Sequence, residues 1–240
     1  MPLVRGMEGK GRVLLVLFLP FALNFLISTA IATYVISTTK APSEEIGREI
    51  FRTIMTYNFY WSIIQVTFGL YAARAMGGSK WLKEQYSRED FSDALRSAGL
   101  VLGLVVISTA VIWAFQFLAA LSSGGIEAYF KTWKEMVATI PLWSRLYFVL
   151  VAPFTAGIFE EILWRGYGIS RLEEHMGTRK AVLVQAVAFG LWHGISLHTI
   201  ATAIIGLIYG YVYASRRRLL VISTAHVLTD IIGFYLAFFT

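Results

Sequence analysis

The sequence predicts an all-α polytopic membrane protein: a membrane helical bundle of about seven transmembrane helices plus one or two interfacial amphipathic helices. Hydrophobic residues make up 57% of the chain and charged residues 15%, against roughly 25% charged in a soluble domain. The mean hydropathy is +0.63, and the apolar residues form long blocks instead of the 3.6-residue stripe of a soluble helix. We expect a single integral membrane domain over residues 1–240.

Seven apolar blocks account for the expected transmembrane helices. The first follows a basic leader but, at about 24 residues, exceeds the roughly 7–15 of a signal-peptide core, so we expect a retained helix. The sixth is short and follows the fifth with hardly a loop. The blocks cover residues 13–36, 55–73, 97–121, 146–168, 181–197, 199–214 and 219–239.

Two connecting stretches are amphipathic. In residues 46–54, apolar side chains recur at helical spacing among acidic and basic ones, and residues 126–137 repeat this pattern. A helix with one apolar and one charged face lies in the plane of the membrane interface. We therefore expect interfacial helices here, with a gate or a substrate-docking element as the alternative.

The basic residues predict the orientation of the chain. With the N-terminus inside, 15 of the 21 Lys and Arg residues fall on the inner side, which is the bias of cytoplasmic loops. We expect a cytoplasmic N-terminus and an outside C-terminus, in a prokaryotic cell membrane. The run from Arg216 to Arg218 is interpreted as a loop and topology signal.

The overall charge and the cysteine count exclude several classes of function. The net charge of +6 resides in short loops between apolar blocks, so it indicates the lipid bilayer as a partner and no nucleic acid. There is no cysteine, which excludes disulfides, thiolate metal sites and a cysteine nucleophile.

Ionisable residues inside three apolar blocks are the strongest functional signal. Glu160 and Glu161 lie in the fourth block, and a charged side chain near the bilayer centre costs about 2.5–3.5 kcal/mol. His193 lies in the fifth block, and His226 and Asp230 lie in the seventh. At 1.5 Å per residue, Glu160 and the later three residues are roughly 10–18 Å from the cytoplasmic surface. We expect them to converge in one polar cavity in the inner half of the bilayer.

Helical spacing suggests different roles for the two glutamates. Glu161 and Arg165 are four residues apart with the acid first, the favourable order for an ion pair, so we assign them to structure. Glu160 points about 100° away and has no such partner, so it is the candidate general base. His226 and Asp230 are also four residues apart, so the carboxylate can orient the imidazole or share a ligand with it.

The remaining histidine completes a set that can activate water. Glu160, His193, His226 and Asp230 can position and deprotonate a water molecule, and Glu160, His193 and His226 could instead hold Zn²⁺. Each histidine alone is more often a satisfied core residue, and a single Glu–Arg pair is more often a structural brace. A proton- or ion-coupled transporter that uses the same buried carboxylates remains an alternative, as does a non-catalytic membrane scaffold.

Three ordered motifs resemble those of the CAAX-protease and bacteriocin-processing (CPBP) family of intramembrane endopeptidases, including its type II CAAX prenyl proteases. Glu160 to Arg165 is similar to the EExxxR motif, Phe189 to His193 to FxxxH, and His226 to Asp230 to a His followed four residues later by Asn or Asp. The resemblance covers about 145–240, the part of the chain that carries the motifs. No HExxH motif is present.

The resemblance implies a hydrolase of the metalloprotease-like CPBP type that cleaves a peptide or protein substrate, prenylated or not. Glu160 and His193 would activate the water. His226 and Asp230 would form part of the oxyanion site or orient the water, while Glu161, Arg165 and Phe189 would support the structure. Prenyl-processing members commonly have Asn at the position of Asp230. An ionised Asp cannot donate to an oxyanion, so Asp230 is expected to be protonated, a ligand or an orienter of histidine.

Overall fold

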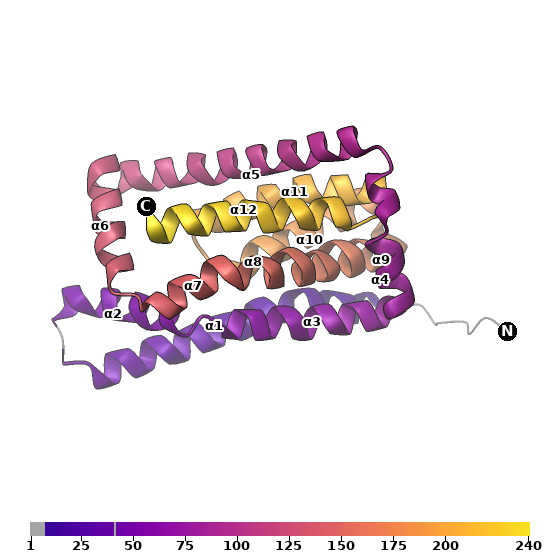
Figure 1. Cartoon of the computed structure of the whole chain (residues 1–240). Coiled ribbons are helices and arrows are strands. Elements are labelled where there is room, and N and C mark those ends of the chain that lie inside the picture. The colour runs from indigo at the N-terminus through magenta and orange to yellow at the C-terminus, as the bar shows by residue number, and fades with distance from the viewer. Residues whose placement is uncertain (1–7, 41) are drawn as a thin grey trace.

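The computed structural model describes residues 8–40 and 42–240, and its regular elements are all helices (Figure 1). This confirms the predicted all-α class. In chain order they are α1 (Lys10–Thr38), α2 (Ser43–Thr56), α3 (Tyr60–Met76), α4 (Ser79–Gln85), the 3-10 helix η1 (Arg88–Phe91), α5 (Ala94–Ser122), α6 (Ile126–Ala138), α7 (Leu142–Leu150), α8 (Ala152–Thr155), the π-helix η2 (Ala156–Ile169), α9 (Ser170–Met176), α10 (Thr178–Trp192), α11 (Leu197–Arg216) and α12 (Leu220–Phe239).

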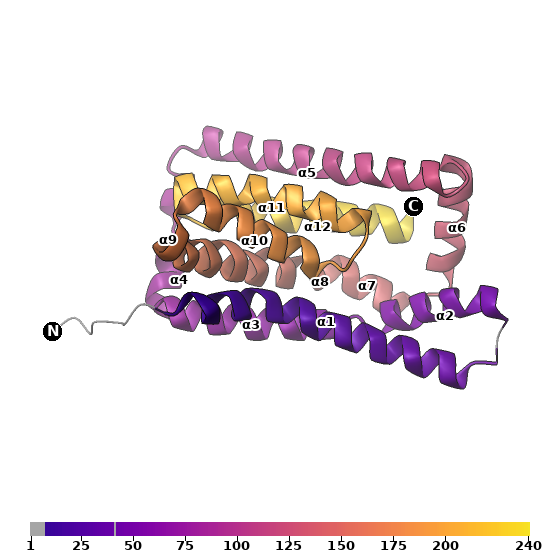
Figure 2. The same ribbon diagram turned by 180° about the vertical axis from the view of Figure 1, so that it is seen from behind.

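Within the described residues, five helical segments are long and apolar enough to cross a membrane. The two other predicted spans correspond to α3, with 17 residues, and α10, with 15, both shorter than the about 20 residues that a crossing needs. Both run along the bundle with the longer helices (Figures 1 and 2). The five segments are Lys10–Thr38, Ala94–Ser122, Leu142–Met176, Leu197–Arg216 and Leu220–Phe239.

The two amphipathic stretches form the helices α2 and α6. Helix α6 lies across the bundle at one end, between α5 and α7, whereas α2 runs back beside the end of α1 (Figure 1). Arg48 on α2 pairs with Glu135 on α6, Nη2 to Oε2 at 3.4 Å. Helix α6 therefore crosses one end of the bundle, while α2 lies roughly along the bundle axis (Figure 1). Their location in the membrane interface stays a prediction.

The fourth predicted span is interrupted, although the sequence predicts one continuous α-helix. The chain leaves helical geometry at Val151 (φ −121°, ψ −52°), and α8 begins at the next residue, Ala152, with Pro153 in its first turn. Proline has no N–H to continue the hydrogen-bond ladder. From Ala156 the chain forms a 14-residue π-helix. Such i→i+5 helices are rare and usually a single turn long, often at functional sites.

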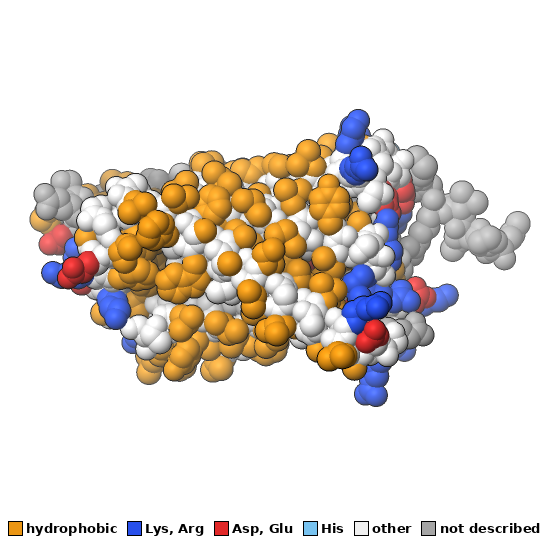
Figure 3. Space-filling view, turned by 90° about the horizontal axis from the view of Figure 1, so that it is seen from above, with side chains coloured by type: hydrophobic (Ala, Val, Ile, Leu, Met, Phe, Trp, Pro, Cys, Tyr) orange, Lys and Arg blue, Asp and Glu red, His pale blue; other side chains and the backbone are white. Residues whose placement is uncertain are grey.

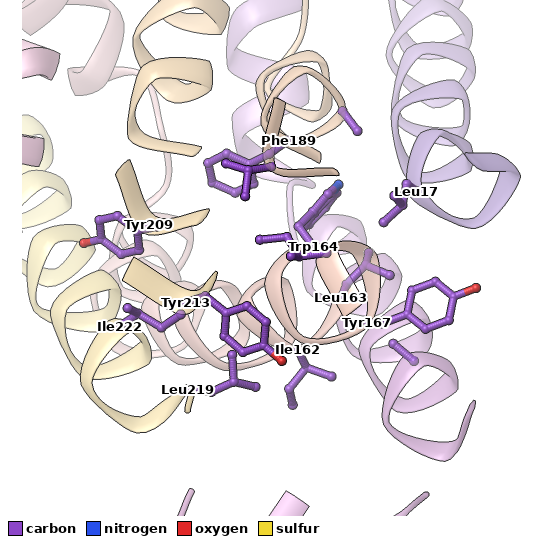
Figure 4. Close-up of a cluster of buried hydrophobic side chains, with 14 of the residues drawn as sticks. Leu17, Ile162, Leu163, Trp164, Tyr167, Phe189, Tyr209, Tyr213, Leu219 and Ile222 are labelled. Carbon is purple, nitrogen blue, oxygen red and sulfur yellow. The ribbon is translucent and has the colours of Figure 1, made fainter. Parts of the chain in front are cut away.

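The π-helix η2 occupies the centre of the bundle, where small residues permit close approach of its neighbours. A Cβ at Gly157 would lie 2.4 Å from Cγ2 of Val227 on α12. A Cβ at Gly69 on α3 would lie 2.7 Å from Cβ of Phe159. Glycine at such contacts is typical of packed membrane helices. The side chains of Ile162 and Leu163, among others, fill the space around η2 (Figure 4).

Lys and Arg side chains gather at the end of the bundle where α1 begins, beyond a wide hydrophobic surface (Figure 3). At this end Asp90 is 4% exposed and binds Arg216, with Nη2 to Oδ1 at 2.7 Å. Its other oxygen accepts a hydrogen bond from the backbone N–H of Val221 at 2.8 Å. Arg216 is therefore more than the loop residue that the sequence suggested, because with Asp90 it joins the end of α11 to the start of α12.

Candidate active site

The predicted site residues lie on three elements. Glu160, Glu161 and Arg165 are on η2, with exposed fractions of 1%, 0% and 0%. His193 is the residue directly after α10, at its C-cap. The other two candidates, His226 and Asp230, lie on α12.

The two carboxylate oxygens of Glu160 have different surroundings. Oε1 accepts hydrogen bonds from Nε2 of Gln65 at 2.7 Å and from Nε1 of Trp192 at 2.6 Å. Among the residues that the structure describes, no group donates a hydrogen bond to Oε2, which lies 3.9 Å from Nε2 of His226. The carboxylate is thus held through one oxygen, and the other remains able to accept a proton.

Glu161 makes the predicted ion pair and also a contact between helices that its spacing does not predict. Its Oε1 lies 3.1 Å from Nη1 of Arg165, with both side chains fully buried. The same oxygen lies 2.7 Å from Nδ1 of His226. A carboxylate only accepts hydrogen bonds, so Nδ1 of His226 carries the proton. Glu161 therefore joins η2 to α12 as well as neutralising Arg165.

The guanidinium of Arg165 is held by aromatic faces in addition to Glu161. Its Cζ lies 4.0 Å from the centre of the Phe189 ring and 5.6 Å from that of Tyr209. Within the described part of the chain, its nitrogens make no hydrogen bond of good geometry. A desolvated cation over an aromatic ring gains about 2 kcal/mol. Phe189 and Tyr209 come from different helices (Figure 4), so Arg165 brings α10 and α11 to the same side of η2.

His226 is oriented by Glu161 and not, as the sequence suggested, by Asp230. Nε2 of His226 lies 3.7 Å from Oδ2 of Asp230, which is too long for a hydrogen bond. The same nitrogen faces Glu160, so three carboxyl groups surround this imidazole. With Nδ1 fixed on Glu161, Nε2 is the nitrogen that faces Glu160 and Asp230.

His193 stands slightly apart from this cluster. Its Nδ1 lies 2.9 Å from the backbone carbonyl oxygen of Phe189, so Nδ1 donates, and Nε2 of the neutral ring is an acceptor. Its ring centre lies 4.9 Å from that of Phe189, and the ring of Phe189 also packs against His226 at 6.2 Å. Among the residues that the structure describes, no hydrogen bond or ion pair joins His193 to Glu160, His226 or Asp230.

The side chains do not form a metal site as they stand. Over residues 8–40 and 42–240, no group of three or more His, Asp and Glu side chains has an arrangement that could hold a metal ion. Glu161 occupies Nδ1 of His226, and His193 does not join the carboxylates. Zn²⁺ bound by Glu160, His193 and His226 therefore remains a prediction from the sequence alone.

Several residues of the site were not found by sequence reasoning, which considered only ionisable groups. Gln65 on α3 and Asn24 on α1 are buried amides, 5% and 6% exposed, and polar side chains in apolar spans were a signal available in the sequence. Trp192 and Tyr209 gave no such signal, because aromatic residues in an apolar block are most simply core residues.

Comparison with known proteins agrees with the motifs. Residues 141–232 match the family model described as Type II CAAX prenyl endopeptidase Rce1-like, which confirms the predicted resemblance to CAAX proteases. The match covers less than half of the chain but includes every predicted site residue. No curated protein and no solved structure was found to match the chain.

Proposed function

We propose that this protein is an intramembrane endopeptidase that hydrolyses a peptide bond of a membrane-associated or prenylated CAAX-type substrate. One observation carries the proposal beyond the family match: Glu160, 1% exposed, is fixed through Oε1 and keeps Oε2 free beside His226. A buried carboxylate in that state is suited to accept a proton from water.

In the first step, Glu160 removes a proton from water as the water oxygen attacks the carbonyl carbon of the substrate. His193, whose Nε2 can accept a hydrogen bond, is the second group to orient that water. Glu160 later gives its proton to the leaving amine, so that the protons balance across the cycle. The products are a new carboxylate and a new amine.

His226 is the group that donates a hydrogen bond to the developing oxyanion. Glu161 fixes its Nδ1, and in the protonated ring Nε2–H can donate to the carbonyl oxygen of the substrate. A donor aimed at developing charge in a site shielded from water is worth several kcal/mol of barrier. Arg165 offsets the charge of Glu161 and stays outside the chemistry.

The proposed orientation places the N-terminus in the cytoplasm and the C-terminus outside. Supporting it, Lys and Arg side chains gather at the end of the bundle where α1 begins (Figure 3), as cytoplasmic faces do. The site would then be reached from that side or from the bilayer.

A peptide panel tests the proposal. Farnesylated CAAX peptides and unmodified apolar peptides are incubated with the wild type, with Glu160→Gln and with the matched control Glu127→Gln, whose side chain is exposed on α6. We expect the wild type and the control to cleave, and Glu160→Gln to lose at least about a hundred-fold in turnover. Equal cleavage by Glu160→Gln would remove Glu160 from the mechanism. If the prenylated and plain peptides were cleaved equally, the prenyl group would not be part of recognition.

A further inference from the structure

A buried polar network connects the first and third helices to the candidate active site. Asn24 on α1 donates from Nδ2 to the backbone carbonyl oxygen of Trp192 at 3.0 Å. Its Oδ1 accepts from Nε1 of Trp61 at 2.9 Å and from the hydroxyl of Tyr60 at 3.0 Å. The rings of Trp61 and Trp192 pack with centres 4.7 Å apart. Trp192 is therefore fixed through both its backbone and its ring by residues that precede the segment matched by the family.

The network ends on one oxygen of Glu160. Gln65 and Trp192 both donate to Oε1, at 2.7 Å and 2.6 Å, and two donors fill the two lone-pair directions of that atom. Both donors are neutral, and both stabilise the ionised carboxylate. They also turn Oε2 toward His226. The contacts thus determine which oxygen accepts the proton.

We propose that Gln65 is a positioning residue for the hydrolysis, so that α1 and α3 complete an active site whose motifs all lie between residues 141 and 232. The inference rests on the proposed function, because it assigns Gln65 its effect through the base Glu160. Gln65 touches no reacting atom. It acts by holding Oε1, so that Oε2 faces His226.

The test variant is Gln65→Leu, which removes the Nε2 donor and replaces the amide by an apolar side chain of similar size. A matched control is Gln185→Leu on α10. Gln185 is also fully buried, but it donates only to the backbone oxygens of Val182 and Gly206. Trp192→Phe is a second test variant, because it removes the other donor and retains the aromatic ring.

Turnover is measured on the peptide that the wild type cleaves best. Loss of a hydrogen bond to a charged group predicts a fall in kcat of about ten- to hundred-fold for Gln65→Leu, with KM nearly unchanged. Gln185→Leu should keep the wild-type kcat, whatever its thermal stability.

The result that overturns the inference is a Gln65→Leu variant with the wild-type kcat, or equal changes in Gln65→Leu and Gln185→Leu. The infrared carboxylate band of Glu160, assigned at one pH by difference from Glu160→Gln, gives a readout without substrate. We expect loss of the hydrogen bond to Oε1 to shift the position of this band in Gln65→Leu but not in Gln185→Leu. If the wild type cleaves no peptide, the proposed hydrolysis fails, and the band position still decides whether Gln65 holds Oε1 of Glu160.

Discussion

Replacing Arg165 by methionine tests the electrostatic centre of the fold. The substitution keeps a long apolar side chain but leaves Glu161, which is 0% exposed, without its cation at 3.1 Å. Removing one partner of a buried ion pair costs about 3–5 kcal/mol. His226 still donates to Glu161 at 2.7 Å, so we expect the lower end, about 3 kcal/mol. For a chain of this size that lowers Tm by about 6–12 °C.

Tryptophan fluorescence during thermal unfolding in detergent measures this change, and a second variant isolates its cause. Glu161→Gln combined with Arg165→Met removes the uncompensated charge, and the new amide oxygen can still accept from His226. We expect the double variant to recover most of the lost Tm. An Arg165→Met protein as stable as the wild type, or a double variant no more stable than the single one, would refute the electrostatic reasoning. A fully stable but inactive Arg165→Met would place Arg165 in the chemistry instead.

Three further predictions follow from single contacts. Gly157→Ala on η2 should lower Tm, because the new Cβ would lie 2.4 Å from Cγ2 of Val227 on α12. Gly233→Ala on α12, where no atom lies within 4 Å of the new Cβ, should leave Tm unchanged by comparison. Equal effects on Tm would contradict close packing at Gly157. Asp230→Asn should retain turnover of prenylated CAAX peptides, since an amide can donate to an oxyanion; complete loss in peptide assays would mean that the carboxylate is required. Trp192→Phe should slow turnover about ten-fold or more while leaving Tm within a few degrees of the wild type. An unchanged kcat would mean that the hydrogen bond from Nε1 of Trp192 to Glu160 does not contribute to turnover.

The sequence was sufficient for the fold class and for the motif residues. Long apolar blocks predicted the helical bundle, and the ionisable groups inside them predicted that Glu160, His193, His226 and Asp230 converge. The structure brings Glu160 and Asp230 close to His226. Among the described residues, His193 makes no hydrogen bond or ion pair with these three. Spacing within one helix also predicted the pairing of Glu161 with Arg165, which the structure contains.

What could not be predicted depends on contacts between helices. Residue spacing predicted that Asp230 orients His226, but Nδ1 of His226 donates to Glu161 on η2. Spacing along one helix cannot indicate a partner on another helix. For the same reason, the sequence did not predict that Gln65 and Trp192 donate hydrogen bonds to Glu160. The π-helix changes the local backbone geometry without an obvious sequence signal, and the chain reverses directly after His193, which shortens α10 to 15 residues.

The central claim is that Glu160 acts as a base on water and not as a nucleophile. A single turnover in ¹⁸O-labelled water, with enzyme in excess over a cleavable peptide, tests this claim by mass spectrometry. Direct attack by water predicts one ¹⁸O atom in the new carboxylate of the product from the first turnover, and no label in Glu160. An unlabelled first product, with ¹⁸O in the side chain of Glu160, would show that the glutamate itself attacks the peptide and would contradict the account.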